Sequence, residues 1–594
     1  MARQEIESLR EAMKKHWIAL SVIPTADPHG SEYPGEHFKA RKYLSGFTGS
    51  AGTLAVSADW AGLWTDGRYF LQAERQLAGS GITLYKMGEE GVPSLEEELA
   101  RRLPERGILA YDGTIVSRKM GQSLRQIAEK KDGRIRLIDL PEEVWADRPA
   151  RGKEPVFSLE LCYAGESRMQ KLSRVREQMK KENAEMHVVT TLDDIAWLTN
   201  LRGSDIICNP VFLSYLVLSM EEAWLFVQDG VLSGTVLEEL SEDHIHVCSY
   251  DNFFREFASV CRFKTVLADS SRVNEQTWSA LKGARHIVDK PNPSTTMKAV
   301  KNPVEAENMR KAHVKDGVAV TKFLYWLKKQ IGRQPITEGG AAAYLEQCRA
   351  EGEHYFGPSF STIAAYGSNG AQVHYGMEGE GAPLLPEGFL LVDSGGQYLE
   401  GTTDITRTVA LGPLTAKQRR DFTAVLKGML ALGDVKFLRG IRGANLDYVA
   451  REPLWSIGLD YLHGTGHGVG YFLNVHEGPN GFRWKLPPEG TETAVLAAGM
   501  VTSDEPGFYL EGEYGIRTEN LLLCREAEKN RYGQFLEFEH LTMAPIDLDA
   551  VDLEWMDERD KKRLNGYHQK VRETLSPYFE GEELRWLEEA TRAV

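Results

Sequence analysis

Four acidic residues in the second half of the chain lie at the borders of apolar or β-prone segments. Asp393 directly follows the apolar run 389–392, and Asp404 lies in the β-prone segment 401–406, with a turn expected at 393–396. An antiparallel pairing of these segments would place both carboxylates on one face. Two buried carboxylates side by side repel each other strongly, and a cation between them removes that cost.

Glu505 and Glu519 repeat this arrangement further along the chain. Glu505 follows the strand-like segment 500–504 and precedes a Pro-Gly turn, whereas Glu519 lies inside the apolar segment 515–523. The alternation of strand, turn and strand predicts a second hairpin on which the two glutamates meet.

Histidine alternates with glycine between the two acidic pairs, from His463 to Gly470. The four alternate glycines exclude a stable helix, and they allow the backbone to approach a bound ion or substrate closely. Imidazole is a common ligand of transition metals. We therefore expect His463, His467 and His476, which lies nine positions after His467, to supply candidate ligands.

Two Asp, two Glu and one His give five ligands, mostly oxygen. This set suits a pair of ions such as Mn²⁺ better than a single Zn²⁺ held by thiolates. Such a pair can hold a bridging hydroxide and polarise a carbonyl group. Each residue alone has a simpler explanation, because an Asp at a strand end usually caps a turn. The hypothesis of a dinuclear metal site rests on all of them occurring together at the edges of apolar strands.

The segments that must position these residues fall into three predicted domains, 1–153, 154–300 and 301–594. Linker-like stretches with proline occur near residues 148–155 and 290–293. Strands and helices alternate up to about residue 288, which predicts two α/β domains in succession. A long helix is expected after Asn302, and the charged tail is expected to form helices that pack on the third domain.

Composition narrows the class of protein. The net charge of -16 argues against bulk nucleic-acid binding, which requires basic patches. No apolar run approaches the roughly 20 residues of a membrane span, and the N-terminus lacks an apolar signal core. The six cysteines include no C-x-x-C pair, which indicates a reducing compartment. We expect a cytoplasmic protein that binds neither membranes nor nucleic acids.

A family resemblance is carried by DSGGQYLEGTTDITRT, YLHGTGHGVGYFLNVHEGP, TSDEPGFY and GIRTEN. Together these motifs resemble the pita-bread metallopeptidases, in particular the long, three-domain Xaa-Pro aminopeptidases (aminopeptidase P). NLRGSDIICNPVF, FTGSAG and TDGRYFLQA in the first half also resemble that subgroup, so the resemblance covers essentially the whole chain. It implies an α/β and α+β fold, with two creatinase-like N-terminal α/β domains followed by a C-terminal pita-bread catalytic domain with a helical extension.

The resemblance also implies a role for each ligand. Asp393 would chelate one metal ion, and Asp404 and Glu519 would bridge both ions. His467 and Glu505 would bind the second ion. The subgroup usually uses two Mn²⁺ ions and commonly forms homodimers.

Further roles are implied for residues around the ligands. His374, His463 and His476 would contact the substrate or the tetrahedral intermediate, and Glu505 would transfer protons. The sequence departs from the family pattern at Thr518, where a larger aliphatic residue is expected, and this departure leaves the ligands unaffected. For Arg407 and Arg517, which flank two ligands, we expect salt bridges behind the metal site, with an exposed position as the alternative.

The activity implied is the release of the N-terminal residue from peptides with proline at position two. A first alternative is a prolidase, which cleaves Xaa-Pro dipeptides only and is typically shorter. A second is a non-catalytic pita-bread binding module, which typically lacks the metal ligands. Hydrolysis of small amidines by a creatinase-type enzyme needs no metal, so the five ligands argue against it.

Overall fold

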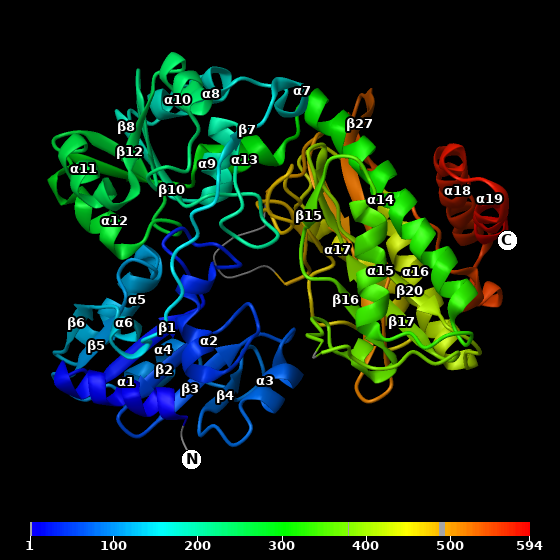
Figure 1. Ribbon diagram of the computed structural model, residues 1–594, viewed down its shortest axis with the longest axis horizontal. Helices are drawn as coiled ribbons and strands as arrows, with labels where there is room; N and C mark the ends of the chain where they lie inside the picture. The colour runs from blue at the N-terminus through cyan, green and yellow to red at the C-terminus, as the bar shows by residue number, and fades with distance from the viewer. Residues whose placement is uncertain (1–2, 378, 486–493) are drawn as a thin grey trace. The chain divides into compact units, whose positions relative to one another are not determined.

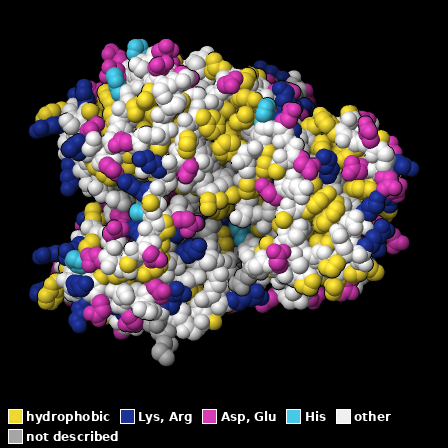
Figure 2. All heavy atoms as spheres, in the orientation of Figure 1, with side chains coloured by type: hydrophobic (Ala, Val, Ile, Leu, Met, Phe, Trp, Pro, Cys, Tyr) yellow, Lys and Arg dark blue, Asp and Glu magenta, His cyan; other side chains and the backbone are white. Residues whose placement is uncertain are grey.

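The computed structural model describes residues 3–377, 379–485 and 494–594 (Figure 1). The chain divides into two compact units, one covering residues 1–159 and 166–294 and the other residues 160–165 and 295–594. Within the described ranges, none of the helices combines the length and apolar character needed to cross a membrane. On the face drawn in Figure 2, lysine and arginine side chains are interspersed with aspartate and glutamate.

The first unit contains two six-stranded sheets of the same topology. The first has the order β4-β3-β2-β1-β5-β6 and the second the order β12-β11-β10-β8-β13-β14. In each sheet the second, third and fourth strands of this order pair antiparallel with one another. All other neighbouring strands pair parallel. The predicted succession of two α/β domains is confirmed. The strands are β1 (Leu20–Pro24), β2 (Thr53–Ser57), β3 (Ala61–Thr65), β4 (Thr83–Lys86), β5 (Ile108–Tyr111), β6 (Arg134–Leu137), β8 (Met186–Val189), β10 (Ser214–Ser219), β11 (Ala223–Val227), β12 (Ile245–Ser249), β13 (Thr265–Ala268) and β14 (His286–Asp289).

Helices cover both faces of the first sheet. Leu54 and Val56 of β2 belong to one apolar cluster, and Ala55 between them belongs to another, as the two-residue period of a strand requires. Burial on both faces explains why Leu54, Ala55 and Val56 form an uninterrupted apolar run. The helices of the first unit are α1 (Gln4–Lys15), α2 (Ala40–Ser45), α3 (Phe70–Gln76), α4 (Leu95–Arg102), α5 (Arg118–Glu129), α6 (Leu140–Val144), α8 (Arg168–Lys181), α9 (Leu192–Thr199), α10 (Gly234–Glu242), α11 (Phe253–Val260) and α12 (Glu275–Ala280).

The second unit is framed by the long helix α14 (Pro303–Gln330). Asn302 caps its first turn and Glu305 completes a capping box, with proline at the first helical position. Its buried face includes Val320, Phe323 and Leu327, as the helical period predicts. The other helices are α7 (Leu161–Ala164), α13 (Pro293–Ala299), α15 (Glu338–Ala350), α16 (Ala416–Gly433), α17 (Asp447–Trp455), α18 (Glu558–Leu575) and α19 (Gly581–Ala590).

The C-terminal tail forms helices α18 and α19, as expected. Leu564, Val571 and Leu587 are buried in one apolar cluster with residues of α16. This packing confirms the expectation that the tail covers the third predicted domain.

In the described part of the second unit, the strands form three small sheets and two separate hairpins. The sheets have the orders β15-β18-β19, β16-β17-β20 and β21-β28-β27-β24, and the hairpins are β22-β23 and β25-β26. Their bounds are β15 (Tyr355–Pro358), β16 (Ile363–Tyr366), β17 (Phe389–Ser394), β18 (Gly396–Tyr398), β19 (Gly401–Thr402), β20 (Ile405–Ala410), β21 (Lys436–Leu438), β22 (Gly466–His467), β23 (Gly481–Phe482), β24 (Val501–Asp504), β25 (Gly507–Leu510), β26 (Tyr514–Arg517), β27 (Asn520–Asn530) and β28 (Gly533–His540).

The turn of the first acidic hairpin lies later than the sequence suggested. Residues 393–396 do not reverse the chain: β17 runs through Ser394, and β18 begins at Gly396. The chain reverses between Tyr398 and Gly401, which pair with each other. Gly395 is required because a Cβ there would lie 2.0 Å from the carbonyl oxygen of Thr403. Gly395 therefore allows two segments of main chain to pack closely where they cross.

Candidate metal centre

Strand pairing brings Asp393 and Asp404 onto one face. In the antiparallel pair β17-β20, Asp393 lies opposite Thr406, and Asp404 lies two residues before Thr406, just ahead of β20. Because side chains alternate along a strand, Asp393, Thr406 and Asp404 share a face. The first predicted hairpin is confirmed, with the two carboxylates as diagonal neighbours.

A second hairpin places Glu505 opposite Glu519. Strand β24 pairs with β27 up to Asp504 and Asn520, and β25 pairs with β26 from Gly507 and Arg517 in the same register. Glu505 and Glu519 therefore face each other where the two ladders are interrupted. The amide of Glu519 donates to the carbonyl of Thr406 at 3.1 Å, which joins this hairpin to the first one.

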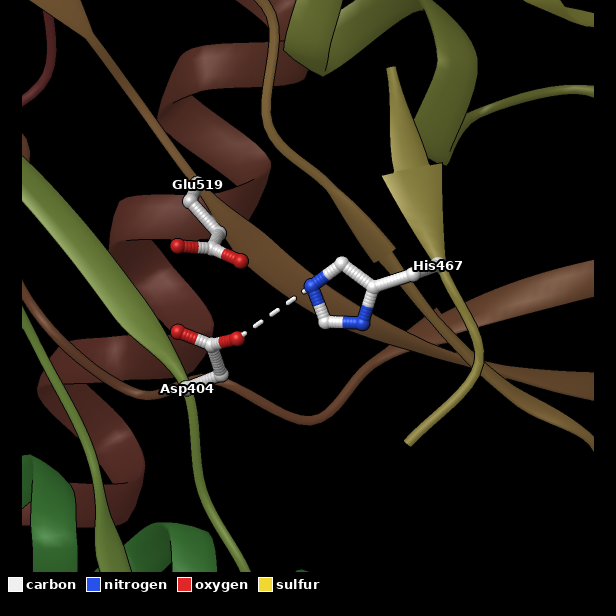
Figure 3. A group of neighbouring side chains, drawn as sticks. All are labelled: Asp404, His467 and Glu519. Atoms are coloured by element: carbon white, nitrogen blue, oxygen red, sulfur yellow. Dashed lines mark ion pairs between the residues drawn. The ribbon is translucent and has the colours of Figure 1, made fainter. Parts of the chain in front are cut away.

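His467 reaches the carboxylates from the short strand β22. Its amide donates to Ser503 Oγ at 2.9 Å, so β22 lies beside β24. Its Nδ1 donates to the carbonyl of Gly468, which leaves Nε2 facing the carboxylates. Nε2 lies 3.5 Å from Asp404 Oδ2 and 3.3 Å from Glu505 Oε1. One ligand atom each from Asp404, His467 and Glu519 lies within 4.8 Å of the other two (Figure 3).

The glycines around His467 have a different role from the expected one. A Cβ at Gly466 would lie 1.8 Å from the carbonyl oxygen of Ser503, and one at Gly468 would lie 2.0 Å from that of Glu477. Their close approach is to neighbouring main chain, where the sequence suggested an ion or substrate. They allow β22 to lie against β24 and so hold the imidazole in place.

The charges of the site are strongly coupled. Burial, with the nearby charges of Asp404 and Glu505, raises the pKa of Glu519 well above its usual value. Burial also raises the pKa of Asp393 to about 6, against the opposing effect of Arg517. Burial lowers the pKa of His467, but Asp404 and Glu505 outweigh it and raise that pKa well above 6.5. The cluster thus favours added positive charge, which protons or metal cations can supply.

A metal pair fits the donor atoms. Asp393 Oδ1 and Glu519 Oε1 are buried and accept no hydrogen bond from the described part of the chain. Buried carboxylate oxygens without donors are costly unless a cation coordinates them. Four carboxylates and one neutral imidazole nitrogen form an oxygen-rich set of donor atoms that suits divalent cations.

Arg517 forms the expected salt bridge behind the site. Its Nη2 lies 2.6 Å from Asp393 Oδ2, and its Nη1 donates to Tyr509 Oη at 2.7 Å. Its Nε donates to Thr406 Oγ1, which in turn donates to Glu519. The guanidinium therefore orients ligands from both hairpins, and the salt-bridge prediction for Arg517 is confirmed.

Among the described residues, Arg407 does not form the expected salt bridge, and it is not exposed. It is buried, with 4% of its surface accessible. It binds neutral acceptors around the two hairpins, which are the carbonyls of Thr406, Glu519, Ala544 and Pro545 and the side chains of Asn520 and Tyr567. Strand alternation explains the difference, because Arg407 points to the face opposite Thr406 and the ligands.

His463 uses both ring nitrogens within the protein. Nδ1 contacts the carbonyl of Gly464 at 2.7 Å, and Nε2 contacts Tyr509 Oη at 2.9 Å. Burial lowers the pKa of His463 to about 4, so the ring is neutral near pH 7. Nδ1–H then donates to Gly464, and Nε2 accepts from Tyr509. To contact substrate through Nε2, His463 must first give up its hydrogen bond with the Tyr509 hydroxyl.

The other two histidines lie on separate segments. His476 is half-buried, and its ring stands edge-on to that of His467 at a centroid distance of 4.3 Å. His374 is half-buried in the turn after the 3-10 helix η4 (Gly367–Ala371). Helix η4 packs against β25 and β26, with Gly370 against Gly515. This contact places the His374 turn beside the hairpin that follows Glu505.

Tyr509 is a site residue that the sequence reasoning did not single out. It lies in β25, four residues after Glu505, and links His463 to Arg517. Burial raises the pKa of Tyr509 to about 12, so it remains a neutral donor. The signal available was its place in TSDEPGFY, where Tyr509 shares strand parity with Glu505.

Family models match the chain along its length. The model described as Creatinase/Prolidase N-terminal domain matches residues 5–149, and a second model of that description matches residues 147–305. Metallopeptidase family M24 matches residues 307–526, and the C-terminal region of peptidase M24 matches residues 534–594. These matches support the expected order of two creatinase-like domains and a catalytic domain.

Relatives of similar length are known. Proteins from Laccaria bicolor and Neurospora crassa, each described as "Probable Xaa-Pro aminopeptidase P", are 39% identical over 98% of this chain, and cover 92% and 88% of their own lengths. The solved X-prolyl aminopeptidase from Caenorhabditis elegans, described as a cytosolic enzyme with a di-nuclear active site, is 32% identical over 100% of both chains, with a TM-score of 0.94. A Xaa-Pro dipeptidase from Bacillus anthracis shares the fold over 64% of this chain and 99% of its own, at 21% identity and a TM-score of 0.51.

Proposed function

The chain belongs to the Xaa-Pro aminopeptidase P family of M24 metallopeptidases, and we propose that it cleaves the peptide bond between an N-terminal residue and a penultimate proline. The observation that carries the proposal is the meeting of Asp404, His467 and Glu519 where two hairpins join. Asp393 and Glu505, on the same two hairpins, would complete a set of five ligands. The chain is thus a metal-dependent aminopeptidase, and its substrate class is the proposed part.

Two divalent ions, Mn²⁺ in this proposal, would be held by the five residues. Asp393 would bind one ion, His467 and Glu505 the other, and Asp404 and Glu519 both. Bound there, the ions would polarise the scissile carbonyl and lower the pKa of a water shared between them, so that hydroxide forms near neutral pH.

Glu505 would carry the proton to the leaving group. The proline nitrogen belongs to a tertiary amide without N–H and leaves poorly until it is protonated. Without metal, the hydrogen bond and charge of His467 hold the pKa of Glu505 below its usual value, against the effect of burial, so Glu505 is ionised. His374 would stabilise the developing oxyanion, and His476 would contact substrate on the leaving side. His463 would join His374 only after its Nε2 releases Tyr509 and carries the ring proton.

Substrate length separates this proposal from a prolidase. Chelator-stripped protein, reloaded with Mn²⁺, is incubated with Arg-Pro-Pro, Arg-Ala-Ala and Arg-Pro. We expect free arginine from Arg-Pro-Pro only, restored by the metal. Cleavage of the dipeptide alone would assign a prolidase, and bound metal without any cleavage would assign a binding module.

The remaining parts of the proposal concern the setting of the enzyme. We propose a cytoplasmic homodimer built from domains 1–153, 154–300 and 301–594. The location follows the Caenorhabditis elegans neighbour, which is described as cytosolic, and the dimer follows the family resemblance of the sequence. Light scattering at assay concentration tests the dimer, because a monomeric mass in fully active protein contradicts it. Reloading with Mn²⁺, Zn²⁺ or Co²⁺ separately, followed by metal analysis, tests the choice of ion.

A further inference from the structure

The segment that carries His374 closes around one buried carboxylate. This segment, residues 367–382 with residue 378 outside the described chain, connects β16 to the stretch before β17. Glu338, the first residue of α15, lies beneath it with 0% of its surface exposed. Metal coordination does not involve Glu338, because the ligands come from the hairpins described above.

Four hydrogen bonds converge on the Glu338 carboxylate from both ends of the segment. Oε1 accepts from the amide of Tyr366 at 2.7 Å and from Asn369 Nδ2 at 2.9 Å. Oε2 accepts from Tyr375 Oη at 2.9 Å and from the amide of Ala382 at 2.8 Å. One oxygen therefore holds the start of the segment, and the other holds its end and the residue next to His374.

The main chain is fitted to this carboxylate. The amide of Glu338 donates to the carbonyl of Ala382, and that of Gly339 donates to the carbonyl of Glu380, both at 3.0 Å. Gly381 has a positive φ of 66°, and a Cβ there would lie 2.4 Å from Glu338 Oε2. Only glycine leaves room for the carboxylate at this point. The backbone conformation at Gly381 therefore lets the segment pack directly on Glu338.

Only a carboxylate satisfies all four donors. Two of them are main-chain amides, one on each oxygen, and a main-chain amide cannot reverse its role. A glutamine amide would direct its NH₂ group at the amide of either Tyr366 or Ala382, whichever way it turned. Buried donors that face each other are costly, so the segment would shift to separate them.

We propose that Glu338 is a positioning residue for the peptidase reaction, which fixes His374 through its hydrogen bond to Tyr375. The inference rests on the role proposed above for His374. A carboxylate that accepts a hydrogen bond from Tyr375 sets the direction of the main chain at position 374. The histidine then meets the developing oxyanion without first being ordered, which raises kcat and leaves KM nearly unchanged.

Two variants of different severity test this role. Glu338→Gln disturbs both ends of the segment. Tyr375→Phe removes a single hydroxyl and leaves the other three hydrogen bonds of the Glu338 carboxylate in place. The matched control is Glu380→Gln, an exposed residue of the same segment whose carboxylate accepts from Thr337 Oγ1. Each variant is also made in a His374→Ala background, and metal content and melting temperature are measured throughout.

We expect Glu338→Gln and Tyr375→Phe to lower kcat for Arg-Pro-Pro by about tenfold or more, with full metal content and KM within about threefold. In the His374→Ala background the same changes should alter kcat by less than about twofold. Glu380→Gln should leave kcat at the wild-type value. Unchanged kcat in both variants, or losses that multiply with that of His374→Ala, would overturn the proposal, as would a His374→Ala variant of normal kcat.

Failure of the proposed function gives a different result. If the metal-loaded wild type cleaves no peptide, the activity assignment fails while the geometry is still testable. Histidine side-chain ¹⁵N NMR, with the His374 signals assigned by their loss in His374→Ala, reports the ring directly. Shifts in Glu338→Gln and Tyr375→Phe but not in Glu380→Gln support the positioning role, and unchanged signals in the first two overturn it.

Discussion

Asp404→Asn removes one charge from the centre of the proposed metal site and nearly preserves shape. The Asp404 carboxylate is buried, and its candidate ligand atom lies within 4.8 Å of those of His467 and Glu519. An ion held among these atoms therefore lies closer than that to the carboxylate. At 4.8 Å and an effective dielectric constant of about 20, one negative charge attracts a divalent ion by about 7 kcal/mol.

Hydration of the ion and the remaining carboxylates offset part of this attraction. If the variant loses half of the attraction between the ion and the Asp404 charge, about 3.5 kcal/mol, the dissociation constant of the metal rises by more than a factor of about 100. Competition with a chelator of known affinity measures that constant, and metal analysis after gel filtration measures stoichiometry. Because Asp404 is proposed to bridge both ions, kcat should fall together with the content of both.

Asp434→Asn is the matched control, because it removes an exposed carboxylate that pairs with Arg563 in the same unit. It should keep wild-type metal content and kcat. The reasoning is refuted if Asp404→Asn, folded by circular dichroism, binds two ions with the wild-type dissociation constant. Retention of half the metal with near-normal turnover would refute the dinuclear part alone.

Three further predictions concern residues around the site. His374→Ala should keep both ions and lower kcat by a factor of about 100 or more, and loss of metal in this variant would make His374 a ligand. Arg407→Met should lower the free energy of unfolding in urea by about 3 kcal/mol or more, because buried carbonyls lose their donor; a loss below about 1 kcal/mol contradicts this. Burial, with the charge of Arg407, lowers the pKa of His568 to about 3 from 6.5, and its Nε2 accepts from the amide of Ile546. The unfolded chain takes up this proton below pH 6.5 and the folded chain does not, so stability falls as the pH falls through that window, by up to about 5 kcal/mol. His568→Gln keeps an acceptor and should flatten the profile of unfolding free energy against pH, whereas parallel profiles would contradict the assignment.

Local pattern was sufficient to predict the ligand-bearing elements. Each of the four proposed carboxylate ligands lies at or beside the end of a strand, and a strand end next to glycine or proline is recognisable from a few neighbouring residues, whereas His467 was recognisable from the glycines around it. The pairing of β17 with β20, and of β24 with β27, then follows from short connections and alternation. The side of each strand also follows, which is why Asp393 and Asp404 were expected on one face.

Contacts between distant segments were not predictable in this way. Glu338 precedes its partner Ala382 by 44 residues. In the sequence, Thr337 and Glu338 look like the ordinary start of a helix, and nothing there indicates that the Glu338 carboxylate is buried. The close approach of Gly466 and Gly468 is to main chain, and a sequence shows that close approach occurs and not what approaches. Arg407 was misplaced because its neighbour Thr406, not Arg407, shares the face of the ligands.

The charge of Arg517 gives the two hairpins a common electrostatic role. With ions bound, the four proposed ligand carboxylates would carry four negative charges, and the adjacent guanidinium would reduce the net charge of this shell to minus three. Two divalent ions would then leave the site with one positive charge, which favours ionisation of a water bound there. Without Arg517 the shell would neutralise the ions completely, and an added hydroxide would give a net negative charge in a buried site. Arg517 would therefore do more than orient Asp393, because its charge would make the proposed dinuclear site compatible with a hydroxide nucleophile.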